Sequence, residues 1–321
     1  MFAIGGTGMK EQTVFEIKAL YRDDFRVKGY TFGSGEKSLC IVGSLRGNEN
    51  QQLYACSLLV QKLKKLEEEG RIAGGKEILV IPCANPYSMN IKKRFWSIDN
   101  TDINRMFPGY SEGETTQRIA NGIFKNIKDY EYGIQFASFY MPGAFVPHVR
   151  IMKFMDYVEQ AKEFGLPYVI LHDVRPFDTT TLNYNWQVWE TKAFSIYTTS
   201  TETIDKKSAG QAVEAVLNFM EKEEMIRYCG DEGYHSRVVD SSRMLTLRTK
   251  DAGFFECHVQ PGERVEKEQL LARVLQPYDG ACLSELLAPE DAVVAFLHNE
   301  AMTYADTAAF KLIMERADEI R

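Results

Sequence analysis

The feature that most constrains the fold is a regular alternation of short apolar runs with longer amphipathic segments over the first two-thirds of the chain. The apolar runs have the length of buried strands, and we expect strands at Ser38–Gly43, Glu77–Pro82, Tyr132–Phe136, Tyr168–His172 and Ala193–Tyr197. The amphipathic segments predict helices at Glu49–Gly70, Gly113–Lys128, Ile151–Phe164 and Ser208–Lys222. Strands and helices that alternate in this way form a mostly parallel sheet with helices on both faces. The sequence therefore predicts an α/β domain.

The last third of the chain has a different pattern. A charged stretch at residues 221–224 closes the last expected helix, and short alternating runs separated by turn residues begin at Ser241. Short strands with frequent turns are typical of a small β-rich unit. We therefore expect two domains, an α/β domain over residues 1–235 and a small β-rich domain over residues 236–321.

The composition excludes several kinds of function. With 45% hydrophobic and 26% charged residues, the chain is an ordinary globular protein. Its net charge of -7 argues against a nucleic-acid partner or an anionic membrane surface, because both need clustered Lys and Arg. No apolar run approaches the roughly 18 residues of a membrane span, and the N-terminus lacks the features of a signal peptide. Six cysteines without a CxxC pair indicate buried, reduced thiols, so we expect a cytoplasmic protein.

The loop after the first expected strand, Gly43-Ser-Leu-Arg-Gly-Asn-Glu49, lies where α/β proteins place their chemistry. It resembles the zinc-binding His-Gly-x-Glu turn of the succinylglutamate desuccinylase/aspartoacylase family of the zinc-carboxypeptidase clan. The resemblance implies a zinc-carboxypeptidase-like fold with a small C-terminal β domain, and a turn whose histidine and glutamate bind zinc. Glu49 stands at the glutamate position, but Arg46 stands at the histidine position. A guanidinium stays protonated and has no lone pair to offer a metal.

A second segment, Asn85–Gly109, resembles the family's Asn-Pro…Arg…Asp-x-Asn-Arg-x-Phe-Pro-Gly signature with its spacing intact. The resemblance implies that Arg94, Asn104 and Arg105 hold a substrate carboxylate. A planar guanidinium suits this role because it binds a carboxylate through two parallel hydrogen bonds. The alternative is that Asp102 and Arg105 form a structural ion pair within a loop.

Two further positions of the family's site are replaced. The second zinc histidine corresponds to Ala137, and the next segment, Pro147–Arg150, fits the family again, so the correspondence has not slipped. The general-base glutamate corresponds to Tyr197, whose phenol, with an ordinary pKa of about 10, accepts protons poorly near neutral pH. Tyr197 can still donate a hydrogen bond. Glu202, in a polar loop five residues on, is either a substitute base or a solvated side chain.

Other residues offer an alternative metal site. A catalytic zinc ion normally has three protein ligands and one open position. Glu49, His148 and His172 supply that number if their loops converge. Without such convergence we expect no cofactor, and zinc is the alternative.

The segment Phe177–Trp189 is rich in hydroxyl, amide and aromatic groups. It is either a loop that faces a ligand or a surface connection packed by Trp186 and Trp189.

Arg46 permits a different role for the turn. It places a fixed positive charge where the resemblance puts zinc, with Glu49 one helical turn away to pair with it. Together with Arg94, Arg105 and Arg150 it predicts a cationic pocket for a small carboxylate-bearing ligand. No group in this set lowers the pKa of water as a metal does.

Three functional hypotheses follow, and they leave open whether the chain is an enzyme. The first is a pseudoenzyme that binds a carboxylate-bearing, N-acyl amino acid-like small molecule. The second is an active metal-dependent amide hydrolase, or deacylase, with a rebuilt zinc site. The third is a scaffold that acts through its β domain and oligomer contacts, and a homo-oligomer is left open in each case.

Overall fold

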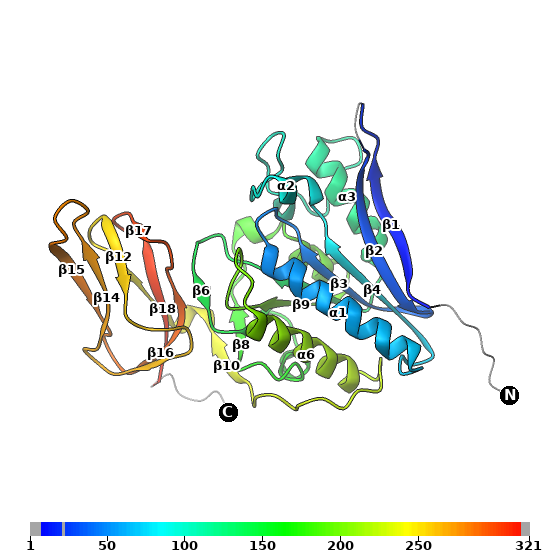
Figure 1. Cartoon of the computed structure of the whole chain (residues 1–321). Coiled ribbons are helices and arrows are strands. Elements are labelled where there is room, and N and C mark those ends of the chain that lie inside the picture. The colour runs from blue at the N-terminus through cyan, green and yellow to red at the C-terminus, as the bar shows by residue number, and fades with distance from the viewer. Residues whose placement is uncertain (1–7, 21–22, 316–321) are drawn as a thin grey trace.

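The computed structural model describes residues 8–20 and 23–315, so the first seven residues of the N-terminal segment discussed above lie outside it (Figure 1). Nine strands form one large sheet in the order β1 (Lys10–Ile17), β2 (Phe25–Gly33), β4 (Gly75–Cys83), β3 (Gly35–Ser44), β5 (Tyr132–Ala137), β9 (Lys192–Tyr197), β7 (His148–Met152), β8 (Tyr168–His172) and β10 (Arg237–Asp240). The pairs β3–β4, β3–β5, β5–β9, β7–β8 and β8–β10 are parallel, and the other three are antiparallel. The prediction of a mostly parallel, mixed sheet is confirmed.

Helices cover both faces of this sheet, as predicted. On one face lie α1 (Asn50–Glu68), α4 (Val158–Lys162) and α6 (Lys206–Lys222), and on the other lie α3 (Thr115–Ile127) and α5 (Leu182–Val188). Alternate residues of β3 enter the two cores, Leu39 on the first face and Cys40 on the second. Figure 1 shows α1 and α6 packed side by side on the first face. Strand β3 is thus buried on both sides, which explains its continuous apolar run.

The predicted helix Ile151–Phe164 is wrong over its first part. Residues 148–152 form β7, and the helix is only the short α4. Val149 and Ile151 are β-branched and lie in the core with period two, which favours a strand over the helical period.

The C-terminal part is a β domain of two packed sheets. One holds β11 (Met244–Arg248), β18 (Ala308–Met314), β16 (Ala292–Leu297) and β13 (Arg264–Val265), and the other β15 (Cys282–Leu287), β14 (Leu270–Leu275), β12 (Gly253–Cys257) and β17 (Met302–Thr303). Two short segments cross the expected boundary after residue 235. Strand β10 belongs to the large sheet, while β6 (Ala144–Phe145), from the first part of the chain, pairs with β16. These pairings hold the β domain against one end of the large sheet.

Cys40 and Cys56 are buried, whereas Cys229 and Cys282 are exposed, so the prediction of buried thiols is wrong for the last two. All six cysteines are free. None of the helices in the described ranges combines the length and the apolar character that a membrane span requires.

Candidate functional site

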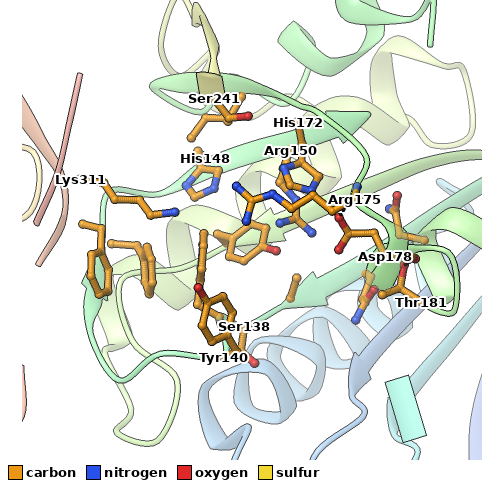
Figure 2. Close-up of a pocket in the computed structure, with 18 of the residues that line it drawn as sticks. Ser138, Tyr140, His148, Arg150, His172, Arg175, Asp178, Thr181, Ser241 and Lys311 are labelled. Carbon is orange, nitrogen blue, oxygen red and sulfur yellow. Dashed lines mark hydrogen bonds and ion pairs between the residues drawn. The ribbon is translucent and has the colours of Figure 1, made fainter. Parts of the chain in front are cut away.

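A cavity of about 340 Å³ lies between the large sheet and the β domain, over β7 and β8 and beside the carboxyl ends of β5 and β9 (Figure 2). The α/β domain lines it with residues from the ends of β5, β8 and β9, from β7, and from the loops around η1 (Ile103–Arg105) and η2 (Pro176–Asp178). The β domain contributes residues of β11, β16 and β18, and η3 (Ser241–Arg243) lies between. The cavity is therefore completed by both domains.

The three positions at which the sequence predicts replaced site residues meet at this cavity. Arg46 follows β3, and Ala137 and Tyr197 are the last residues of β5 and β9. Ala137 and Tyr197 are partners in the parallel register of these two strands, and all three residues line the cavity. Adjacent parallel strands end at one edge of a sheet, which explains the convergence.

Arg46 is held in a buried cluster with two carboxylates. Its side chain is only 4% exposed, and Nη1 lies 3.1 Å from Glu49 Oε1. On its other side Nε donates to both oxygens of Asp102 at 3.1 and 3.0 Å, and Nη2 donates to Oδ2 at 2.9 Å. Although burial alone would lower the pKa of Arg46, the two carboxylates raise it. The expected pairing of Arg46 with Glu49 is present, and Asp102 is its second partner.

Glu49 is fully buried directly before α1 and has its hydrogen-bonding capacity occupied. Its Oε2 accepts from the backbone N–H of Leu45 at 2.8 Å and of Arg46 at 3.0 Å. Its Oε1 accepts from the Arg46 guanidinium and from the Ser138 hydroxyl. Glu49 therefore fixes the turn after β3 rather than facing the cavity.

The alternative interpretation of Asp102 and Arg105 as an ion pair is wrong, because Asp102 pairs with Arg46. Arg105 donates to the Phe177 carbonyl at 2.7 Å and lies 3.6 Å from an oxygen of Asp178. Arg105 also lines the cavity.

The other residues of the second segment differ in position. Asn104 lines the cavity, and its Oδ1 accepts from the backbone N–H of Leu182 at 3.1 Å. Arg94 is absent from the cavity wall and donates to the Phe139 carbonyl at 3.2 Å. Burial, together with the nearby Arg46, lowers the pKa of Arg94 to about 10, so it remains charged at neutral pH.

Three further cations point into the cavity: Arg150, Arg175 and Lys311 (Figure 2). Within the described residues, the charged side-chain groups of these three have no carboxylate oxygen within 4.0 Å, although the backbone N–H of Arg175 donates to Asp178 Oδ2 at 3.0 Å. Burial and the two arginines lower the pKa of Lys311. Sequence reasoning found Arg150 and missed the other two. The available signals were a lone lysine in the apolar run of β18 and an arginine just after β8.

The two histidines have different surroundings. His148 Nδ1 lies 2.8 Å from the Val146 carbonyl oxygen, so it carries the proton, and the ring stacks on Tyr197 with centroids 4.6 Å apart. Burial lowers the pKa of His148 to about 3, which keeps it neutral. His172 Nε2 lies 2.9 Å from Asp178 Oδ2, and burial lowers the pKa of His172. Both rings line the cavity, but in residues 8–20 and 23–315 no three His, Cys, Asp or Glu side chains form a group suited to a metal ion.

The two residues considered as general bases, Tyr197 and Glu202, differ in burial and in position relative to the cavity. Tyr197 is 2% exposed, and burial raises its pKa, so the phenol stays protonated and does not serve as a base. Glu202 is exposed, accepts from the Asn48 amide at 2.8 Å and does not line the cavity.

The segment Phe177–Trp189 both packs into a core and lines the cavity. Trp186 is fully buried in the second core, as expected of a packed connection. The cavity is lined by four other side chains of the segment, Phe177, Asp178, Thr181 and Asn183.

Comparisons with known proteins identify the family and the fold. The family model described as "Succinylglutamate desuccinylase/Aspartoacylase catalytic domain" matches residues 35–222, more than half of the chain. No curated protein matches the chain.

Among solved structures, a succinylglutamate desuccinylase from Silicibacter sp. TM1040 is similar, with a TM-score of 0.81, 18% identity and coverage of 98% of this chain and 97% of that one. The product-bound ectoine utilization protein EutE (DoeB) from Ruegeria pomeroyi has a TM-score of 0.78, 16% identity and coverage of 98% and 97%. A succinylglutamate desuccinylase/aspartoacylase from Rhodobacter sphaeroides has a TM-score of 0.78, 17% identity and coverage of 98% of both chains. At such identities the likeness concerns the fold, and it confirms the predicted zinc-carboxypeptidase-like architecture.

Proposed function

The chain belongs to the succinylglutamate desuccinylase/aspartoacylase family, and we propose that it binds a small carboxylate-bearing, N-acyl amino acid-like ligand without the family's usual zinc site. The observation that carries the proposal is that one cation of the cavity wall is paired with carboxylates while three others, in the part of the chain that the structure describes, are not. Arg46 is neutralised by Glu49 and Asp102, while Arg150, Arg175 and Lys311 face the cavity without a carboxylate partner among the described residues.

The residues at the family's metal position do not fit zinc. Glu49 already accepts two backbone N–H groups, the Arg46 guanidinium and a hydroxyl, so it has no free lone pair of good geometry. A zinc ion beside Glu49 would also be repelled by Arg46 at short range. Ala137 offers no donor atom. The zinc chemistry typical of the family therefore lacks its ligands here.

The free cations support an anionic ligand. Each guanidinium can bind a carboxylate through two parallel hydrogen bonds, and Lys311 adds a point charge. Like charges that line one cavity repel one another, and a bound anion relieves that repulsion. The carboxylates of an N-acyl amino acid match these groups in size and charge.

Calorimetric titration with N-acetyl-L-aspartate and with its uncharged diamide tests the proposal. We expect the dianion to bind and the diamide to show no measurable binding. Replacing Arg150 or Arg175 by Gln should weaken binding at least tenfold, since each removes a charge-assisted contact. Arg273→Gln is the matched control, because Arg273 pairs with Glu285 on the far sheet of the β domain. Equal binding of the diamide, or unchanged affinity in both cavity variants, would overturn the proposal.

The second candidate function is an active metal-dependent amide hydrolase that uses Glu49 with His148 or His172. One observation favours it, since His148 Nε2 is buried without a hydrogen-bond partner. Metal analysis of protein purified without chelators separates the two candidates. We expect no bound zinc in the wild type and about one zinc per chain in Arg46→His/Ala137→His, which restores two imidazoles beside Glu49. Stoichiometric zinc in the wild type that is lost in Glu49→Gln, with amide hydrolysis, would establish the hydrolase instead.

A further inference from the structure

We propose that the ligand of this cavity is an aromatic N-acyl dianion, whose two negative charges meet Arg150, Arg175 and Lys311 while its planar acyl group stacks on aromatic side chains at the mouth. This inference rests on the proposed function and narrows it from carboxylates in general to one class.

The number of free cations requires more than one negative charge. Figure 2 shows the side chains of Arg150, Arg175 and Lys311 directed toward the middle of the same cavity. Asp178, the acidic residue on the cavity wall, already pairs with His172 and lies near Arg105. A single carboxylate would leave two of the three cations uncompensated. A dianion lowers their mutual repulsion much further.

The cavity also has an aromatic wall, which small N-acetyl ligands would not use. Phe139 and Phe145 stack with centroids 4.1 Å apart, Phe145 lies 4.7 Å from Phe296, and Phe139 lies 4.8 Å from Tyr197. The free cations lie over this wall, with Arg150 5.0 Å from the Tyr197 ring centre and Lys311 5.3 Å from that of Phe139. Cationic and aromatic groups therefore present adjacent subsites.

Two cavity-lining aromatic residues remain exposed to solvent. Tyr140, in the loop after β5, is 62% exposed, and Phe177, in η2, is 50% exposed. The guanidinium of Arg175 lies 5.8 Å from the Phe177 ring centre. A planar group seated here would remove apolar surface from water and gain ring–ring attraction. Because these two rings and the free cations line the same cavity, one short molecule can contact both.

The size of the cavity fits this ligand class. Its volume of about 340 Å³ is at the small end of ligand pockets, which range over about 300–1,000 Å³. One aromatic ring joined to a four-carbon diacid is a molecule of this scale. A longer peptide or a nucleotide would be too large.

Calorimetric titration with three probes tests the class: N-benzoyl-L-aspartate, N-acetyl-L-aspartate and N-benzoyl-L-alanine. We expect N-benzoyl-L-aspartate to bind about tenfold or more tightly than each of the other two, since one lacks the ring and the other lacks the second charge. In Tyr140→Ala the ratio of benzoyl to acetyl affinity should fall at least threefold. Tyr278→Ala is the control, because Tyr278 is 96% exposed in the turn between β14 and β15, and it should leave the ratio unchanged.

Each outcome of these titrations tests a different part of the inference. Equal binding of the benzoyl and acetyl aspartates overturns the aromatic assignment and leaves the carboxylate-binding function intact. Equal binding of N-benzoyl-L-aspartate and N-benzoyl-L-alanine overturns the claim that the ligand carries two negative charges. If no probe binds, both this inference and the proposed function fail. If the ratio of benzoyl to acetyl affinity is unchanged in Tyr140→Ala, the acyl group does not bind at the mouth of the cavity.

Discussion

Replacing Arg46 by Met tests the buried charge cluster directly. The change removes the guanidinium between Glu49, which is fully buried, and Asp102, whose side chain is 14% exposed. Removing one member of a buried ion pair typically costs about 3–5 kcal/mol, because the remaining charge stays desolvated. Glu49 keeps its two backbone N–H donors and Asp102 keeps some access to water, so we expect about 3 kcal/mol. For a domain of this size each kcal/mol lowers the melting temperature by about 2–4 °C, so the expected loss is roughly 10 °C. Differential scanning calorimetry of the wild type and of Arg46→Met measures this loss.

Two variants control the interpretation. Arg175→Met also removes a cavity arginine, but one without a carboxylate within 4.0 Å among the described residues, and it should change stability by less than about 0.5 kcal/mol. Asp102→Asn added to Arg46→Met should recover at least about 1 kcal/mol, because it removes one of the two unpaired charges. A loss below about 1 kcal/mol in Arg46→Met, or a loss equal to that of Arg175→Met, would refute the cluster as a stabilising unit.

Two further predictions concern a buried histidine and a tight turn. Burial lowers the pKa of His148 to about 3, whereas the unfolded chain takes up this proton near pH 6.5, so the free energy of unfolding should fall by about 2 kcal/mol between pH 7.5 and pH 5. In urea titrations the fall in the free energy of unfolding from pH 7.5 to pH 5 should be about 2 kcal/mol smaller in His148→Phe than in the wild type. An equal fall in both proteins would contradict the lowered pKa of His148. In Gly47→Ala the new Cβ would lie 2.2 Å from a backbone oxygen, so we expect a loss of about 1–3 kcal/mol by chemical denaturation. Gly210→Ala, in α6 with nothing within 4 Å of the added Cβ, should instead be neutral or stabilising, and similar losses in both would rule out the steric explanation.

The parts of the fold predicted from sequence are those in which a local pattern and burial agree. Strand β3 carries an apolar run that enters both cores, and alternate residues of β5 enter the first core, so the burial of both strands is visible in the sequence alone. Strand β7 was missed because two polar residues, His148 at its start and Arg150 at its centre, line a cavity and break the apolar run. The short strand β10 gave no signal because four residues are too few to show a period.

The candidate site could likewise be predicted from the sequence only in part. The convergence of Arg46, Ala137 and Tyr197 could be predicted because parallel strands share an edge. Lys311 and Arg175 could not, since their place in the cavity depends on how the β domain packs against the sheet and on the path of a loop. Arg94 was predicted to hold the ligand, yet its guanidinium is directed to a backbone carbonyl. Sequence patterns identify edges and segments, while the direction of a long side chain depends on tertiary contacts.

Arg46 links the two family motifs of this chain, and that link accounts for the retained acidic residues. Glu49, in the first motif, keeps the family's residue but uses both oxygens to fix the turn and the guanidinium. Asp102, in the second motif, binds the opposite edge of the same guanidinium. The positive charge of Arg46 is thus balanced by carboxylates from two loops, so Arg46 is not available to bind an anion in the cavity. In the function that we propose, ligand binding then falls to Arg150, Arg175 and Lys311, which line one cavity of a chain whose net charge is -7. Three neighbouring positive charges repel one another, and a bound anion would relieve that repulsion, so the proposed anion site is separate from the buried cluster around Arg46.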